Sequence, residues 1–162
     1  MAGLIKSWLQ VVPWEVVVAI NAALCEARKA LHQPTSDGYA PAKELREKNR
    51  LMKISLPELL QLGFQCHRLA PFCNYNGNTF VTIVKTLLDA ELKRMPPDQS
   101  FIVRSIAGHI VAGTASDIER KQPDTLLIAG GFGKISWPEF YCGIKGAMGG
   151  GVSLSFTQPK KS

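Results

Sequence analysis

Apolar side chains recur at helical spacing along most of this 162-residue chain, in segments bounded by proline and glycine. Such a repeat places the apolar side chains on one face of a helix, and that face must be buried against other elements. Residues 80–95 show the pattern best and end at the Pro96-Pro97 pair. Their expected inward face is Phe80, Val84, Leu87, Leu88 and Leu92. The pattern therefore predicts a bundle of packed helices.

Two further segments illustrate how the boundaries are predicted. Ser55-Leu56-Pro57-Glu58 has the residues of a capping box with proline in the first turn, so a helix is expected over 56–70. Asn76-Gly77 has turn residues, so residues 72–78 are expected to be a loop. The full set of expected helices is 13–33, 42–53, 56–70, 80–95, 98–116 and 137–148, after a short helical lead at 3–12.

Some of these helices carry specific packing predictions. The 13–33 helix is expected to turn one face inward: Val16, Ile20, Ala23, Leu24, Ala27 and Leu31. The 98–116 helix is apolar around most of its circumference, which predicts a central, buried position. Gly108 on that helix is expected to permit a close helix contact.

The chain is predicted to be a mainly α, compact domain of about six helices that spans residues 1–162. A small β element is expected near the C-terminus, from short strands at 126–129 and 152–156. Lys53–Glu58 and Lys134–Glu139 agree at all positions but one, about half a chain length apart. The match suggests an internal duplication with halves 1–79 and 80–162, although helix capping alone could produce the same residues twice.

Charge gives the main indication of function. The formal net charge is +6 with a pI near 9.3, which favours an anionic partner. Residues 42–53 form the densest basic segment, and this face is either a binding surface or simply a solvated helix face. The candidate residues for contact with an anionic partner are Arg28, Lys29, Lys43, Arg46, Lys48, Arg50 and Lys53.

A glycine-rich segment at 126–134 is a candidate nucleotide loop. A phosphate-binding P-loop needs a glycine and a hydroxyl where this chain has Ile128 and Ile135. A dinucleotide fingerprint fits slightly better, but no acidic residue follows at the ribose-binding distance. The candidate residues are Gly130, Gly131, Gly133 and Lys134; the alternative is a structural glycine turn.

Residues 133–140 (GKISWPEF) are similar to the second half of an EF-hand calcium loop. Gly133 matches the turn and Glu139 the bidentate ligand, but Ile128, Gly130 and Phe132 occupy positions that need oxygen ligands. In the copy at 47–58, Leu51 and Met52 replace a ligand and the glycine. The resemblance implies at most a calcium-independent helix pair that binds a partner helix.

The sequence predicts neither a metal site nor a cofactor. Cys66, His67 and Cys73 lack the second ligand pair of a structural zinc site, and no local catalytic signature is present. The four cysteines have no framework spacing, which indicates free thiols in a reducing compartment. Polar residues and Pro13 interrupt the apolar run at 8–24, so a cytoplasmic protein without a transmembrane segment is expected.

These observations together favour a non-enzymatic binding or assembly protein. It would self-associate and contact nucleic acid or an acidic membrane surface, as a viral matrix protein or nucleoprotein does. The first alternative is an EF-hand-like adaptor that binds a helix of another protein. The second is a nucleotide-binding enzyme that uses the Gly130–Gly133 loop.

Overall fold

The computed structural model describes residues 5–115, which form a mainly helical fold. Within this range are five α-helices, one 3₁₀ helix and a two-stranded sheet. The helices are α1 (Trp14–Ala27), α2 (Tyr39–Asn49), α3 (Leu56–Leu69), α4 (Asn76–Leu92) and α5 (Pro97–Ala112). The predicted β element at 126–156, the helix at 137–148 and the second copy of the suggested repeat lie outside the described residues.

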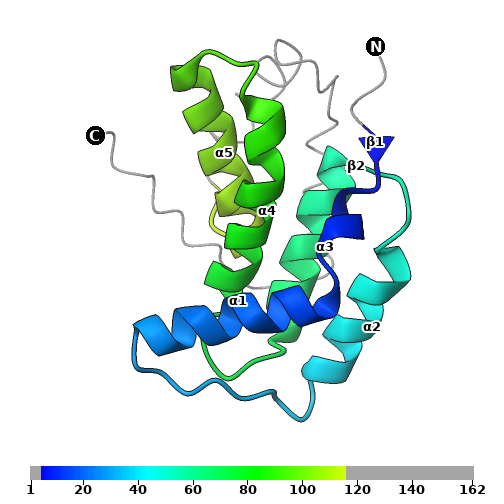
Figure 1. The fold of residues 1–162 in the computed structure, drawn as a ribbon, viewed down its shortest axis with the longest axis vertical. Helices are drawn as coiled ribbons and strands as arrows, with labels where there is room; N and C mark the ends of the chain where they lie inside the picture. Colours follow the sequence, from blue (N-terminus) through cyan, green and yellow to red (C-terminus); the bar gives the residue numbers. More distant parts are fainter. Residues whose placement is uncertain (1–4, 116–162) are drawn as a thin grey trace.

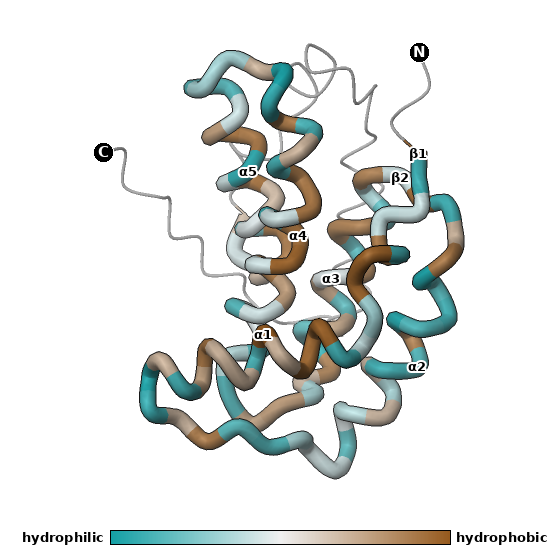
Figure 2. The backbone as a smooth tube through the Cα atoms, in the orientation of Figure 1, coloured by the Kyte–Doolittle hydropathy of each residue, from teal (hydrophilic) through white to brown (hydrophobic). Residues whose placement is uncertain are grey.

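The three helices α3, α4 and α5 pack against one another and form the centre of the fold. Helices α4 and α5 lie side by side, α1 lies crosswise at one end, and α2 packs on α3 (Figure 1). The short connection from Lys93 to Pro96 makes α4 and α5 antiparallel neighbours. Figure 2 shows hydrophobic bands on α3 and α4, whereas α2 is mostly hydrophilic.

The sheet joins the N-terminus to the start of α3. Strands β1 (Ile5–Lys6) and β2 (Ile54–Ser55) pair antiparallel, with Ile5 opposite Ser55 and Lys6 opposite Ile54. A 3₁₀ helix, Trp8–Val11, follows β1 and buries Trp8 and Leu9. The helical lead expected at 3–12 is therefore a strand followed by a 3₁₀ turn. The described sheet lies near the N-terminus, while a β element was predicted near the C-terminus.

The capping box that begins α3 is confirmed. The Glu58 backbone N–H donates to Ser55 Oγ at 3.4 Å, and the Ser55 N–H donates to Glu58 Oε2 at 3.0 Å. The predicted inward residues Leu59 and Phe64 are buried. On α4, Phe80 and Leu88 are also buried as predicted. The apolar period thus identified the faces of these two helices correctly.

The predicted starts of α2 and α4 were wrong. Helix α4 begins at Asn76, because Asn76-Gly77 is its first turn and not a loop turn. Helix α2 begins at Tyr39, ahead of the expected residue 42, because Pro41 is tolerated within a first turn. In addition, α5 is buried on one face only: Val103 and Ile106 are buried, while Phe101 is 66% exposed.

The prediction for α1 was wrong in both length and face. The helix ends at Ala27, and Lys29 adopts a left-handed backbone with φ of 53° that reverses the chain. The buried side chains are Trp14, Val17, Asn21 and Cys25, whereas Leu31 is 60% exposed. The buried face of α1 contains a polar residue. Counting apolar residues at helical spacing therefore identified the neighbouring face as the inward one, which was wrong.

Asn21 is that polar residue, and it connects α1 to three other segments. Its Nδ2 donates to the Asn74 carbonyl at 2.8 Å and to Thr79 Oγ1 at 3.0 Å. Its Oδ1 lies 2.7 Å from His32 Nδ1, a ring that packs against Phe72. The side chain is fully buried, so each of these bonds replaces one that water would otherwise supply. The bond to His32 accounts for the chain reversal after α1.

Replacing Asn21 with alanine should therefore lower the free energy of unfolding by about 2–4 kcal/mol, because several buried polar groups lose their partner. Urea unfolding followed by circular dichroism measures this change. Asn78→Ala is the matched control, since Asn78 is exposed and its replacement should change stability by about 0.5 kcal/mol or less. Equal effects of the two substitutions would contradict the structural role of Asn21.

Candidate functional site

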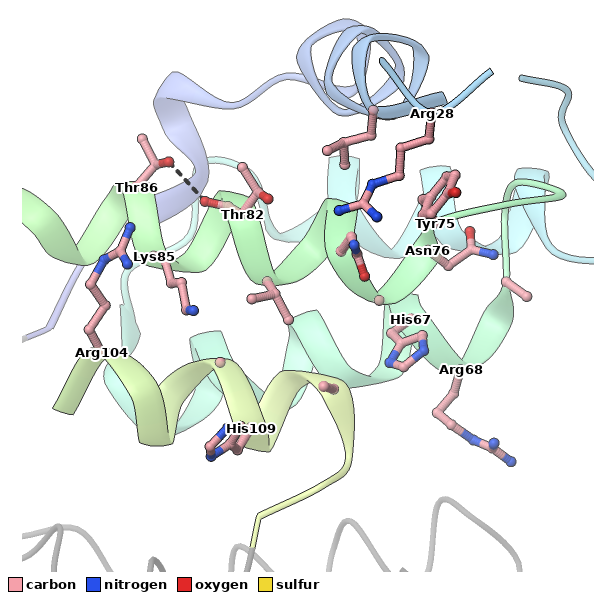
Figure 3. A pocket seen from close by; sticks show the side chains of 17 residues that line it. Arg28, His67, Arg68, Tyr75, Asn76, Thr82, Lys85, Thr86, Arg104 and His109 are labelled. Carbon is pink, nitrogen blue, oxygen red and sulfur yellow. Dashed lines mark hydrogen bonds between the residues drawn. The ribbon is translucent and has the colours of Figure 1, made fainter. Parts of the chain in front are cut away.

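A large open cleft lies where the C-terminal ends of α1 and α3 meet α4 and α5. Its volume is about 1100 Å³, and its walls come from all four helices and the α3–α4 connection (Figure 3). Arg28 and Tyr75 lie together near the start of α4, while Lys85 and Arg104 lie further along it. The cleft is a concave surface of the size that ligands occupy.

Basic side chains dominate the described lining of this cleft. Four carry a permanent or near-permanent positive charge: Arg28, Arg68, Lys85 and Arg104. His67 and His109 also line it, whereas no Asp or Glu is found among the described lining residues. Arg104 Nε donates to Asp89 Oδ1 at 2.9 Å, in a pair whose side chains are 43% and 51% exposed. We call this surface the basic cleft.

Each cation reaches the cleft from a different helix. Arg28 is the C-cap of α1, Arg68 lies in the last turn of α3, and Lys85 lies near the middle of α4. Gly108 of α5 explains how closely Lys85 is held: a Cβ at this position would lie 2.7 Å from Lys85 Cε. The expected close contact at Gly108 is thus confirmed, and its consequence is to place the Lys85 stem against α5.

The pKa of Lys85 is lowered by its environment in the cleft. Burial lowers this pKa, the charge of Arg104 lowers it further, and the Asp89 carboxylate opposes both effects. Because like charges disfavour each other's charged form, an anion that entered the cleft would relieve the repulsion. The cleft is therefore electrostatically suited to an anionic ligand.

His67 lines the cleft, and its surroundings lower its pKa. Its Nδ1–H donates to the Val111 carbonyl at 3.1 Å, and its Nε2 faces Gly77 in the first turn of α4. Burial lowers the pKa of His67, the bond to Val111 partly opposes this shift, and the charge of Arg68 adds to it. His67 therefore ties α3 to the end of α5 and supports the cleft.

The predicted anionic-partner residues are divided by the fold. Arg28 lies in the basic cleft, and Lys29 is exposed at the turn that follows it. Lys43, Lys48 and Lys53 are exposed on α2 or just after it, and α2 contributes no residue to the described lining of the cleft. Arg50 Nε lies 3.4 Å from Glu47 Oε2. The single predicted surface is thus two separate groups of cations.

Arg46 belongs to neither group, because it is buried. The residue is 2% exposed, and its guanidinium carbon lies 5.9 Å from the centre of the Phe80 ring. Its three guanidinium nitrogens have no hydrogen-bond partner in the described part of the chain. Burial lowers the pKa of Arg46 and raises that of the adjacent Cys66 thiol to about 12. Arg46 therefore cannot contact a partner at the surface in this conformation.

Of the other candidate sites, some lie within residues 5–115 and some lie outside the described residues. Gly130, Gly131, Gly133 and Lys134 lie outside the described residues, as does the EF-hand-like segment at 133–140. In the copy at 47–58, Glu47 Oε1 accepts from the Trp14 N–H at 2.9 Å and Glu58 completes the capping box. Residues 5–115 contain no group of three or more His, Cys, Asp or Glu side chains that could hold a metal ion.

Sequence reasoning missed Arg68, Lys85 and Arg104. They lie far apart in the chain, and Lys85 is not part of the inward face predicted for its helix. No local motif connects them, since they become neighbours only when α3, α4 and α5 pack together. A count of basic residues within one segment favoured α2 instead.

The chain matches no protein-family model, no curated protein sequence and no solved structure. Between residues 5 and 115, no helix combines the length and apolar character that crossing a bilayer requires. The function must therefore be inferred from the cleft itself.

Replacing Arg46 with methionine should raise the free energy of unfolding by about 1–4 kcal/mol, because it removes an unpaired buried charge and keeps apolar volume. Thermal and urea unfolding measure the effect. Lys48→Met, on the exposed side of the same helix, serves as the control and should change stability by about 0.5 kcal/mol or less. A marked decrease in the free energy of unfolding of Arg46→Met would instead show that the buried Arg46 guanidinium has a stabilising partner.

The lowered pKa of His67 also predicts a pH dependence. Because the folded-state pKa lies below the unfolded value of 6.5, the unfolded chain binds more protons, and stability should fall as the pH drops below about 6.5. His67→Gln keeps a side-chain donor but does not titrate, so its stability should vary less between pH 7.5 and 5.5. Identical pH profiles for the two proteins in urea unfolding would exclude His67 as the cause.

Proposed function

We propose that this protein binds nucleic acid through the basic cleft and has no catalytic role. The observation that supports the proposal is the convergence of Arg28, Arg68, Lys85 and Arg104 from four helices on one concave surface. Lys and Arg side chains supply most of the affinity for a phosphate backbone, by neutralising phosphates and releasing counterions. The lowered pKa of Lys85 adds to the argument, since burial and the charge of Arg104 disfavour the charged form of Lys85. A bound anion would favour that form, as the Asp89 carboxylate already does in part.

The shape of the surface favours nucleic acid over an acidic membrane. The cations line a cleft of about 1100 Å³ and come from its walls, so a flat bilayer would reach only the rim. A polymer chain can enter the cleft and contact several cations at once. Polar side chains of Asn78 and Thr82 also line the walls and can hydrogen-bond to phosphate, sugar or base.

The exposed lysines of α2 are a competing surface for the same partner. Lys43 and Lys48 are exposed on one helix, as the sequence predicted, but they form no concave site with the residues of the cleft. Self-association, the EF-hand-like adaptor and the nucleotide-binding enzyme stay predictions from the sequence. The cleft is the surface on which the proposal rests.

Neutralising two cleft cations should weaken binding far more than neutralising two lysines of α2. Fluorescence anisotropy with a labelled 20-nucleotide single strand measures affinity between 50 and 200 mM salt. For Arg68→Gln/Lys85→Gln we expect affinity to fall about tenfold or more. The slope of log affinity against log salt should also fall by about 0.7 for each phosphate that the variant no longer neutralises. The matched control is Lys43→Gln/Lys48→Gln, which removes the same charge.

Three results would contradict the proposal. Equal decreases in affinity for the two double variants would assign binding to net charge alone, and a larger decrease for the control would assign it to α2. Absent or salt-insensitive binding would exclude an electrostatic nucleic-acid site. Salt-dependent binding to phosphatidylserine vesicles without binding to the oligonucleotide would identify a membrane surface as the partner.

A further inference from the structure

Tyr75 and Ala70 are described lining residues of the basic cleft that adopt a left-handed backbone without being glycine, and Tyr75 also contributes an aromatic ring. Tyr75 is the N-cap of α4 and has φ of 58° and ψ of 32°, a left-handed backbone that residues other than glycine, asparagine and aspartate rarely adopt. Its side chain is partly buried and lines the cleft. Strained backbone of this kind often occurs at functional sites, where the surrounding structure holds it in place.

The neighbouring residues fix this conformation. The Thr79 backbone N–H and Oγ1 both donate to the Tyr75 carbonyl, at 2.9 and 2.7 Å. Asn21 in turn donates to Thr79 Oγ1 and to the Asn74 carbonyl, on the residue just before Tyr75. The side chain of Asn76 bonds to the N–H and the carbonyl of Phe72. The buried network around Asn21 therefore determines where the Tyr75 ring is placed.

Arg28 lies over that ring. Its guanidinium carbon is 5.5 Å from the ring centroid, within the range of a cation–π contact. Figure 3 shows the two side chains together near the start of α4, with Lys85 further along α4 and Arg104 of α5 beside it. An aromatic ring and a guanidinium plane both stack on nucleobases, and cations beside them can bind the flanking phosphates.

We propose that the basic cleft binds single-stranded RNA or DNA, with one base stacked on the Arg28–Tyr75 pair and the following phosphates bound by Lys85 and Arg104. This inference rests on the proposed function and specifies its ligand. In a duplex the bases are paired and stacked on each other, so none is available to the ring. A duplex would contact only the cations at the rim of the cleft.

The test compares a labelled 12-nucleotide single strand, as RNA and as DNA, with a duplex of the same sequence by fluorescence anisotropy. Tyr75→Phe keeps the ring and should bind like the wild type. Tyr75→Gly removes the ring but suits the left-handed backbone, so it should stay folded while single-strand affinity falls about five- to a hundredfold. Tyr75→Asn, which also tolerates this backbone, is a second ring-free variant.

The outcomes separate this inference from the proposed function. Support requires that the wild type prefer the single strand and that the ring-free variants lose that preference with duplex affinity unchanged. If the duplex binds as tightly, or Tyr75→Gly and Tyr75→Asn bind the single strand normally, stacking is excluded. In that case weaker binding by Arg68→Gln/Lys85→Gln would still support the electrostatic site. If the wild type binds neither nucleic acid, both proposals fail.

Discussion

The side chain of Asn21 adds polar connections between segments of this structure that also pack through apolar contacts. From the buried face of α1 it bonds to Thr79 in α4, to the carbonyl before Tyr75, and to His32 in the segment that reverses the chain. A buried amide is stabilising only when its donors and acceptor are satisfied, so these segments are held in one arrangement. The carbonyl of Tyr75 accepts from Thr79, which also bonds to Asn21, so the backbone of Tyr75 is held by the same network.

Cations in the described part of the chain lie in environments of several kinds. Lys43 and Lys48 of α2 lie in solvent, where their repulsion is screened. Those of the cleft come from separate helices, and the pKa of Lys85 is lowered first by burial and then by the charge of Arg104. Arg46 is enclosed between α2, α3 and α4, over the Phe80 ring. Net charge alone does not distinguish these environments. Among the residues that the structure describes, the cleft combines several cations with a concave surface and an aromatic ring.

The sequence predicted well the inward faces of α3, whose buried face is apolar, and of α4, whose buried face is apolar except for Thr79. The faces of α3 and α4 follow the 3.6-residue period, and the Ser55–Glu58 capping box marks the start of α3. Helix α1 was misplaced because Asn21 occupies its buried stripe, and an apolar period cannot reveal a polar residue that finds its partners elsewhere in the chain. The start of α4 was missed since Asn76-Gly77 is compatible with both a turn and a first helical turn.

The sequence by itself determined the helical class of residues 5–115, most of the inward residues of α3 and α4, and the excess of positive charge. These properties depend on local spacing and composition. Only the tertiary structure decided which cations share a surface, because Arg28, Arg68, Lys85 and Arg104 become neighbours through the packing of four helices. The tertiary structure also buries Arg46 and places Tyr75 in the lining of the cleft. Such a constellation depends on contacts between distant residues, which no local pattern in the chain contains.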